Sequence, residues 1–300
     1  MVMAKNEKKD LDNFKVTDGN KLSLSDYPTA FRKKSIEKEE AELQMQKDIV
    51  ELAALQDVLY ADNRHAILIV IQAMDAAGKD GTIKHIMSGV NPAGVKVSSF
   101  KSPTTAELDH DYFWRHYIDL PGKGEIGIFN RSYYENVLIT KVHPEFILNE
   151  HHIDIKQVKD IGKSFWQKRY KQISRFEKNL IENDTIILKF FLHVSKDIQK
   201  KRFMDRIDDV TKNWKFSSAD LKERAYWDDY QSAYEDAIMN TSTKAAPWYI
   251  IPADEKWYTR YLIGNIICSE LKKLELSYPV ISYTEKEALL KAKETLLNEK

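Results

Sequence analysis

Residues 66–82 read AILIVIQAMDAAGKDGT, and this stretch decides the fold. Residues 66–73 are apolar except for Gln72, which is typical of a strand buried on both faces of a parallel sheet. The residues that follow are small or charged, and a helical pattern begins at Lys79. A buried strand, a Gly-Lys turn and a helix in direct succession predict a phosphate-binding loop, because backbone N–H groups and the positive end of a helix then converge on phosphate oxygens.

The turn departs from the usual phosphate-loop pattern at two positions. Ala73 replaces the first glycine, and Asp80 replaces the serine or threonine that commonly binds magnesium. Asp75 lies inside the turn, where a carboxylate repels phosphate unless a metal ion lies between them, so it predicts a Mg²⁺ ligand. The predicted phosphate-binding residues are Ala76, Ala77, Gly78, Lys79, Asp80, Gly81 and Thr82. The alternative is a left-handed turn that only caps a helix.

Outside this stretch, strand and helix patterns alternate. We expect further strands at 95–100, 125–130, 185–194 and 248–252. We expect helices at 33–59, 79–88, 106–117, 155–183 and 257–274, and two more between the last two strands. This alternation favours an α/β fold with a five-stranded parallel sheet and helices on both faces. Residues 1–30 are expected to form a loosely ordered arm, docked through Leu22, Leu24 and Tyr27, and residues 31–300 a single domain with a lid at about 195–245.

The end of the strand at 125–130 is a second candidate site, because ligands of open α/β sheets gather at the carboxyl ends of the strands. Asn130 stands where a phosphate-loop protein usually has an acidic metal ligand. Glu135 can supply the missing charge if residues 132–137 begin a helix, which makes Asp75 and Glu135 the predicted metal ligands. Arg131 suits phosphate oxygens. The alternative is that Asn130 and Ser132 are helix N-caps and that Arg131 forms a surface ion pair.

A basic segment follows the fourth expected strand. Its cations are Lys200, Lys201, Arg202, Arg206, Lys212 and Lys215. Arg202 and Arg206 share one helix face, and Trp214 and Phe216 are expected to anchor the segment by packing. Such a run is commonly a solvated helix face. After a phosphate loop, it also matches the lid of a phosphotransferase that closes arginines over the transferring group.

Composition excludes several classes of protein. The 300 residues carry 46 basic and 46 acidic side chains, so the net charge is zero and no nucleic-acid partner is indicated. No apolar run approaches the ~20 residues that span a bilayer, and the first fifteen residues do not resemble a secretory signal. A single cysteine, Cys268, fits a reducing compartment. These features predict a cytoplasmic protein without a membrane partner.

Ordered blocks of sequence carry a resemblance to a known family. The blocks are AMDAAGKDGTIKHIMSGVNPAG (73–94), SFKSPTTAELDHDYFWR (99–115), FNRSYYENVLITKVHP (129–144), KRFMDRIDD with KNWKFS (201–217) and WYIIPADEKWYTR (248–260). In this order they resemble the second family of polyphosphate kinases, from about Tyr27 to Leu276. The resemblance implies a P-loop kinase fold, a three-layer sandwich related to thymidylate kinases, with a helical lid. It also implies Mg²⁺-dependent transfer between inorganic polyphosphate and nucleotides, and a homo-oligomer, expected to be a dimer or tetramer.

The resemblance assigns roles to particular residues. Asn130 with Glu135 is similar to the subgroup that phosphorylates both AMP and ADP, and GMP and GDP are further candidate substrates. Family members with aspartate at the position of Asn130 mainly convert nucleoside diphosphates to triphosphates. The predicted catalytic residues are Asp75, Lys79, Arg131, Arg202 and Arg206, and Asn130, Glu135 and Lys215 are expected to bind nucleotide or phosphate. We expect direct in-line transfer without a phosphoenzyme. The alternatives are an ATP-dependent nucleoside monophosphate kinase and a regulator that binds nucleotide without turnover.

Overall fold

A six-stranded sheet forms the centre of the computed structural model, which describes residues 11–17, 22–31 and 36–299. In sheet order the strands are β1 (Lys15–Val16), β6 (Trp248–Pro252), β5 (Thr185–His193), β2 (Ala66–Ala73), β4 (Ile126–Asn130) and β3 (Val95–Ser99). The five strands from β6 to β3 are parallel, as the sequence predicts. β1 is an addition: it pairs antiparallel with β6. Two residues are too few to show a strand periodicity, so the sequence did not predict it.

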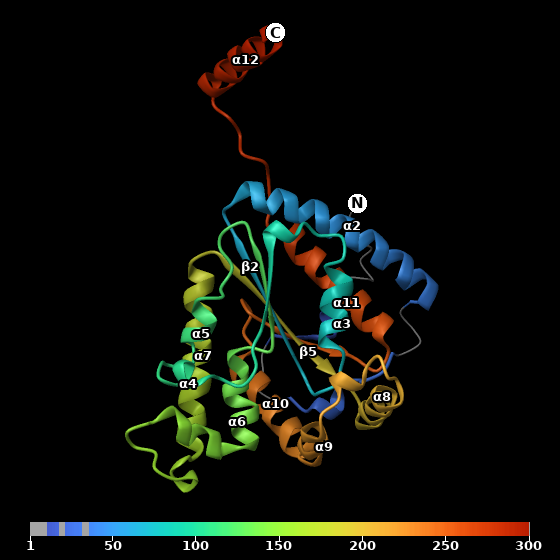
Figure 1. The fold of residues 1–300 in the computed structure, drawn as a ribbon, viewed down its shortest axis with the longest axis vertical. Helices are drawn as coiled ribbons and strands as arrows, with labels where there is room; N and C mark the ends of the chain where they lie inside the picture. Colours follow the sequence, from blue (N-terminus) through green and yellow to red (C-terminus); the bar gives the residue numbers. More distant parts are fainter. Residues whose placement is uncertain (1–10, 18–21, 32–35, 300) are drawn as a thin grey trace.

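Helices cover both faces of the sheet (Figure 1). One group contains α2 (Lys38–Asp62), α3 (Lys79–Ile86) and α11 (Lys256–Lys272). The other contains α6 (Ile139–Val142), α7 (Lys163–Glu182) and α10 (Trp227–Thr241). The predicted three-layer α/β architecture is confirmed. No helix within the described ranges is both long and apolar enough to cross a bilayer.

Several predicted helices differ in extent from the observed ones. The helix expected at 155–183 begins only at Lys163, after a 3-10 turn, η5 (Val158–Asp160). The segment 106–117 forms two short helices, α4 (Thr105–Leu108) and α5 (Trp114–Tyr117). The helix expected from 132 is a 3-10 turn, η3 (Tyr133–Val137). The remaining 3-10 turns are η1 (Leu24–Asp26), η2 (Pro92–Gly94), η4 (Pro144–Glu150) and η6 (Asn213–Lys215).

The described part of the N-terminal arm lies against the body. Phe14 and Leu24 are buried, and the backbone N–H of Ile250 in β6 donates to the Phe14 carbonyl at 2.8 Å. Leu22 and Tyr27 are partly buried against the core. Much of the arm expected at 1–30, namely residues 1–10 and 18–21, falls outside the described residues.

The segment expected to be a lid contains three helices of different character. α8 (Lys196–Asp208) and α9 (Ser218–Ala225) lie at the carboxyl end of the sheet (Figure 1). α10 instead buries Tyr230, Ala233, Tyr234 and Ile238 in the core. These positions recur at helical spacing, so they form one apolar face that packs on the sheet. A lid extending to residue 245 is therefore too long, and only the part before α10 is peripheral.

Candidate active site

The predicted phosphate loop connects β2 to α3 and has the backbone that such a loop needs. Gly78 has φ of 108° and directly precedes α3, so the glycine lies where a side chain would be strained. Ala76 also has a positive φ, 58°, in a region that alanine rarely occupies. A strained non-glycine residue at the positive end of a helix is typical of a site held in a fixed shape for a ligand.

Lys79 lies at the centre of the loop and is buried, with 9% of its surface exposed. Its ammonium turns back along the loop and donates to the carbonyl of Ala73 at 2.8 Å. Burial lowers the pKa of Lys79 to about 8, and the positive charge of Arg131 lowers it further, against the attraction of Asp75, Glu135 and Asp80. A turn that only caps a helix has no need for a buried ammonium. A bound phosphate would stabilise this charge.

Arg131 and Asp75 bring the strand end and the loop together. Arg131 Nη2 donates to Asp75 Oδ1 at 2.9 Å. Arg131 has φ of 63°, and its backbone N–H donates to the carbonyl of Ile71 in β2. The ion pair alternative for Arg131 therefore holds, but the partner is a residue of the phosphate loop and both side chains face the site. An ion pair here gives the guanidinium a defined position beside the loop.

Asp80 and Asn130, which both depart from the usual phosphate-loop pattern, are joined by a hydrogen bond. The Asn130 amide donates to Asp80 Oδ1 at 2.7 Å. The register of the sheet brings the two residues together, because Asn130 pairs with Ile71 of β2 and therefore lies beside the start of α3. An aspartate at 130 would place two carboxylates together. The N-cap alternative is wrong for Asn130 and right for Ser132, which caps η3 through the N–H of Tyr134.

Glu135 faces the same cluster of charges from η3. The Gln72 amide lies between Ser132 and Glu135, and in the orientation that satisfies both it donates to Glu135 Oε1 at 2.8 Å. Burial raises the pKa of Glu135, while the positive charges of Arg131 and Lys79 oppose this rise. The carboxylates of Asp75, Asp80 and Glu135 all act on the charge of Lys79. Among the described residues, their oxygens do not gather within 4.8 Å of one another, so these side chains alone do not form a closed metal site. Separate carboxylates still fit Mg²⁺, which is commonly held by one or two carboxylates together with substrate phosphates.

A fully buried ionic network connects η3 to α7 and β5, and the sequence did not predict it. Lys189 of β5 donates to Glu177 Oε2 at 2.7 Å. Glu177 Oε1 accepts from the hydroxyls of Tyr133 at 2.9 Å and Tyr134 at 2.7 Å. The available signal was a lysine inside the otherwise apolar strand TIILKFFLH. The network fixes the turn that carries Glu135 to α7 and to the sheet.

Arg202 does not have the geometry of a free lid arginine. It is 8% exposed, and its guanidinium donates to four backbone carbonyls. Two of these belong to Ala76 and Ala77 in the phosphate loop, at 3.0 and 2.7 Å, and two to Ala253 and Asp254 after β6. All four Nη hydrogens are thus directed at the backbone. In this conformation Arg202 holds the phosphate loop in shape and does not face a transferring phosphoryl group.

The other predicted lid residues lie near the surface. Arg206 donates to the Lys215 carbonyl at 3.2 Å and forms an ion pair with Asp220 of α9 at 3.7 Å. Lys215 lies over the ring of Trp214. The expectation that Trp214 anchors the segment by packing is wrong, because 79% of its surface is exposed. Phe216 packs edge-on against Phe203 of α8, with ring centroids 6.0 Å apart.

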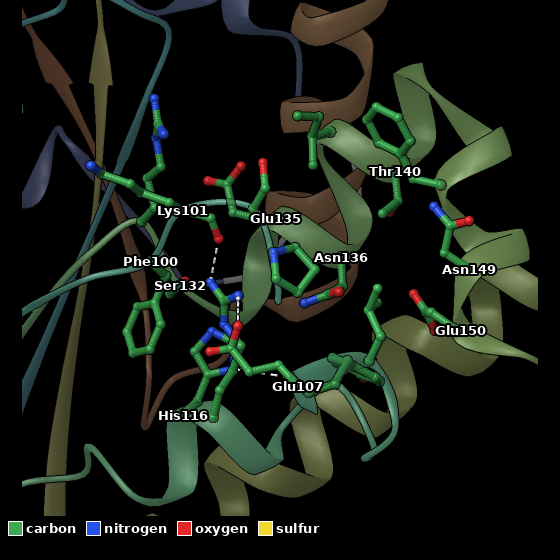
Figure 2. A pocket seen from close by; sticks show the side chains of 18 of the residues that line it. Phe100, Lys101, Glu107, His116, Ser132, Glu135, Asn136, Thr140, Asn149 and Glu150 are labelled. Atoms are coloured by element: carbon green, nitrogen blue, oxygen red, sulfur yellow. Dashed lines mark hydrogen bonds and ion pairs between the residues drawn. The ribbon is translucent and has the colours of Figure 1, made fainter. Parts of the chain in front are cut away.

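A pocket of about 280 Å³ opens beside this cluster, at the carboxyl ends of β3 and β4. Figure 2 shows Lys101 and Glu135 on one side of it, and Asn149 and Glu150 on the opposite side. Apolar, amide and charged side chains all contribute to the lining. Two lining residues, Arg131 and Glu135, belong to the charged cluster, and Ser132 and Asn136 follow them in the chain and also line the pocket. The pocket can accommodate an organic group whose phosphates reach Arg131.

Arg115 shapes one wall of the pocket. Its guanidinium donates to the Lys101 carbonyl and lies 3.3 Å from Glu107 Oε2 (Figure 2). His116 next to it is 1% exposed, and burial lowers its pKa to about 3, with a smaller effect from Arg115. A neutral His116 whose Nδ1 lies 3.0 Å from the Tyr112 carbonyl serves packing and hydrogen bonding. It is not a phosphate-binding cation.

A phosphate loop at the carboxyl end of a central parallel strand, with a buried lysine and an arginine beside a pocket, defines a phosphotransferase of the P-loop kinase class. Residues 35–278 match the family model described as polyphosphate kinase 2, and the chain belongs to this family. An ADP-polyphosphate phosphotransferase of Rhodopseudomonas palustris is 48% identical over 95% of this chain and 97% of its own length. An AMP/ADP-polyphosphate phosphotransferase of Meiothermus ruber is also 48% identical, over 76% of this chain and 80% of its own.

The fold is also that of a solved family member. The crystal structure of polyphosphate kinase 2 from Arthrobacter aurescens TC1 superposes with a TM-score of 0.83 at 36% identity. The match covers 93% of this chain and 95% of that chain. The two relatives named above are equally identical to this chain but differ in the nucleotides of their names. Similarity alone therefore does not decide which nucleotides this chain accepts.

Proposed function

We propose that this enzyme transfers phosphoryl groups between inorganic polyphosphate and nucleotides, converting AMP to ADP and ADP to ATP. The observation that carries the proposal is the junction of two features at Arg131 and Glu135: the charged phosphate-loop cluster on one side and the pocket on the other. A nucleoside in the pocket then places its phosphates beside Lys79. The donor chain approaches from the lid side, where Arg206, Lys212 and Lys215 supply positive charge.

The residues act by positioning and by neutralising charge, because phosphoryl transfer requires little covalent chemistry from the protein. Lys79 and Arg131 hold the terminal phosphates, and the loop N–H groups from Ala76 to Thr82 bind their oxygens. Asp75 and Glu135, with Asp80 nearby, are the residues that would hold Mg²⁺, which supplies charge neutralisation between donor and acceptor phosphates. The transfer is direct and in-line. Arg202 keeps the loop in its binding shape.

The lid belongs to this proposal in a reduced form. It consists of α8 after Arg202, η6 and α9, and it closes over the donor chain with Arg206 and Lys215 turned to phosphate. Closure exchanges the Arg206–Asp220 pair for contacts with phosphate, which costs little because this pair lies near the surface. We place the reaction in the cytoplasm, and we expect the protein to be a homodimer or homotetramer.

Substitution of Glu135 tests the proposal that both AMP and ADP are phosphoryl acceptors. We expect Glu135→Gln to lower kcat/KM for AMP at least about tenfold more than for ADP. AMP has one phosphate fewer to engage Lys79 and Arg131, so its binding depends more on a metal held at Glu135. The measurement is initial rates with each acceptor at saturating polyphosphate and magnesium.

The matched control is Glu107→Gln, which removes a carboxylate from the same pocket but not from the charged cluster. It is expected to affect both acceptors equally. Equal losses for AMP and ADP in Glu135→Gln would contradict the role given to this carboxylate.

A further inference from the structure

The C-terminal helix α12 (Tyr283–Asn298) is the part of the fold that the proposed reaction does not use. It projects away from the body at the end of an extended linker (Figure 1). Every one of its residues is exposed, including the leucines at 289, 290, 296 and 297, which are 57–74% exposed. Its N-terminus carries a complete capping box between Ser282 and Glu285. The sequence therefore specifies a helix here, with its apolar side chains in solvent.

A helix of this length is marginal in water on its own, and stable helices in proteins owe most of their stability to packing of an apolar face. The leucine pairs 289–290 and 296–297 repeat at an interval of seven residues, so they lie on one side of α12. Lys286 and Lys293 lie between the two leucine rows on that side. This pattern is typical of a helix that packs on another, negatively charged, helix surface.

The long helix α2 offers such a surface. Its inner side is buried against the body, but Leu43 and Val50 on its outer side are 60% and 72% exposed. Leu43 and Val50 are seven residues apart and Ala54 follows one turn later, which continues the stripe along the helix. The exposed acidic residues Glu39, Glu40 and Asp57 lie on the same side of α2 as this stripe, so its charge complements Lys286 and Lys293 of α12. The stripe from Leu43 to Ala54 is about 17 Å long, and the leucines of α12 span about 12 Å.

The linker decides between the α2 of the same chain and that of another. Ser277 is held at the end of α2, because its N–H donates to Asp62 Oδ2 at 2.9 Å. To reach its own α2, the chain would have to reverse direction between Ser277 and Ser282. Pro279 opposes this, since it fixes its own φ and keeps Tyr278 extended, and residues 275–282 contain no turn.

We propose that α12 docks on the outer face of α2 of a second copy of this chain, and that the second copy returns the same contact. A reciprocal exchange of this kind is a two-fold symmetric dimer contact that uses both exposed stripes at once. The contact lies on α2 and α12 and includes no residue of the charged cluster or the pocket. It therefore stands or falls independently of the proposed reaction.

Sedimentation of the full chain over a range of concentrations tests the contact. Leu289→Ser with Leu296→Ser, and separately Val50→Glu, are each expected to raise the dimer dissociation constant by about 100-fold or more, because buried leucine and valine side chains carry the contact. Lys291→Ser, on the opposite side of α12, is the matched control and is expected to leave it unchanged. Turnover per site at saturating substrate should be retained in all three. A monomeric wild type, or variants that associate like the wild type, would overturn the proposal.

Crosslinking distinguishes exchange from folding back. One tagged chain carries Val50→Cys, a differently tagged chain carries Leu289→Cys or Leu296→Cys, and the two are co-expressed and oxidised. The native Cys268 is 1% exposed and does not interfere. We expect a disulfide between the two differently tagged chains. A disulfide formed only within a chain carrying both substitutions, or only between two copies of α12, would rule out docking on the partner's α2.

Discussion

Lys79→Met is expected to lower kcat/KM by about 1,000-fold or more and to leave the fold intact. The ammonium is the buried positive charge at the centre of the phosphate loop, and no other described cation occupies that position. Removing a charge that stabilises the transferring phosphates costs several orders of magnitude in rate. Rates with polyphosphate and ADP measure the loss, and circular dichroism checks the fold.

The thermal stability of Lys79→Met distinguishes a loss of catalysis from a loss of folding. Burial holds the pKa of Lys79 at about 8, below its ordinary 10.5, so the charged form is destabilising in the folded protein without ligand. Below pH 8 the variant should therefore unfold at the same temperature as the wild type or higher. Between pH 8 and 10.5 the unfolded chain binds more protons at this site than the folded chain, so the wild type gains stability and the difference narrows. A variant that loses stability along with turnover would contradict this account of Lys79.

Arg202→Met is expected to lower the free energy of unfolding by about 3 kcal/mol, because four backbone carbonyls, three of them in buried hydrogen bonds, lose their donors. Phosphate binding should weaken with it, since the strained loop at Ala76 loses the clamp that holds it. Chemical denaturation measures the first effect and the KM for polyphosphate the second.

Arg206→Met is the control, four residues further along α8. Its ion pair with Asp220 is long and near the surface, so its loss should cost less than about 1 kcal/mol. If Arg202→Met instead keeps wild-type stability and loses only turnover, then Arg202 contacts the transferring phosphate in a closed state, as the sequence pattern suggested.

The strand, loop and helix at 66–86 could be predicted because three independent signals coincide there: an apolar run, a turn of small residues and a helical pattern. The meeting of Asp75, Lys79, Arg131 and Glu135 could be predicted as well, since the carboxyl ends of neighbouring parallel strands lie at one edge of a sheet. These are consequences of chain topology. They do not require knowledge of which side chains are buried.

The roles in the segment after β5 depend on burial, which spacing does not show. Arg202 and Arg206 are equivalent in the sequence pattern, yet one is 8% exposed and binds backbone carbonyls while the other lies near the surface. Trp214 was expected to pack and is exposed. Spacing also does not show the Asn130–Asp80 hydrogen bond. Each residue departs from the usual phosphate-loop pattern, and only the structure shows that the two side chains are partners.

The most direct test of the central claim is the identity of the phosphoryl donor. Purified protein is incubated with magnesium and AMP, with either polyphosphate or ATP as the only donor, and the nucleotides are separated by chromatography. The proposed function predicts ADP and then ATP with polyphosphate, and neither product in the Lys79→Met variant. ADP formed only when ATP is the donor would identify a nucleoside monophosphate kinase, and nucleotide binding without any product would identify a regulator.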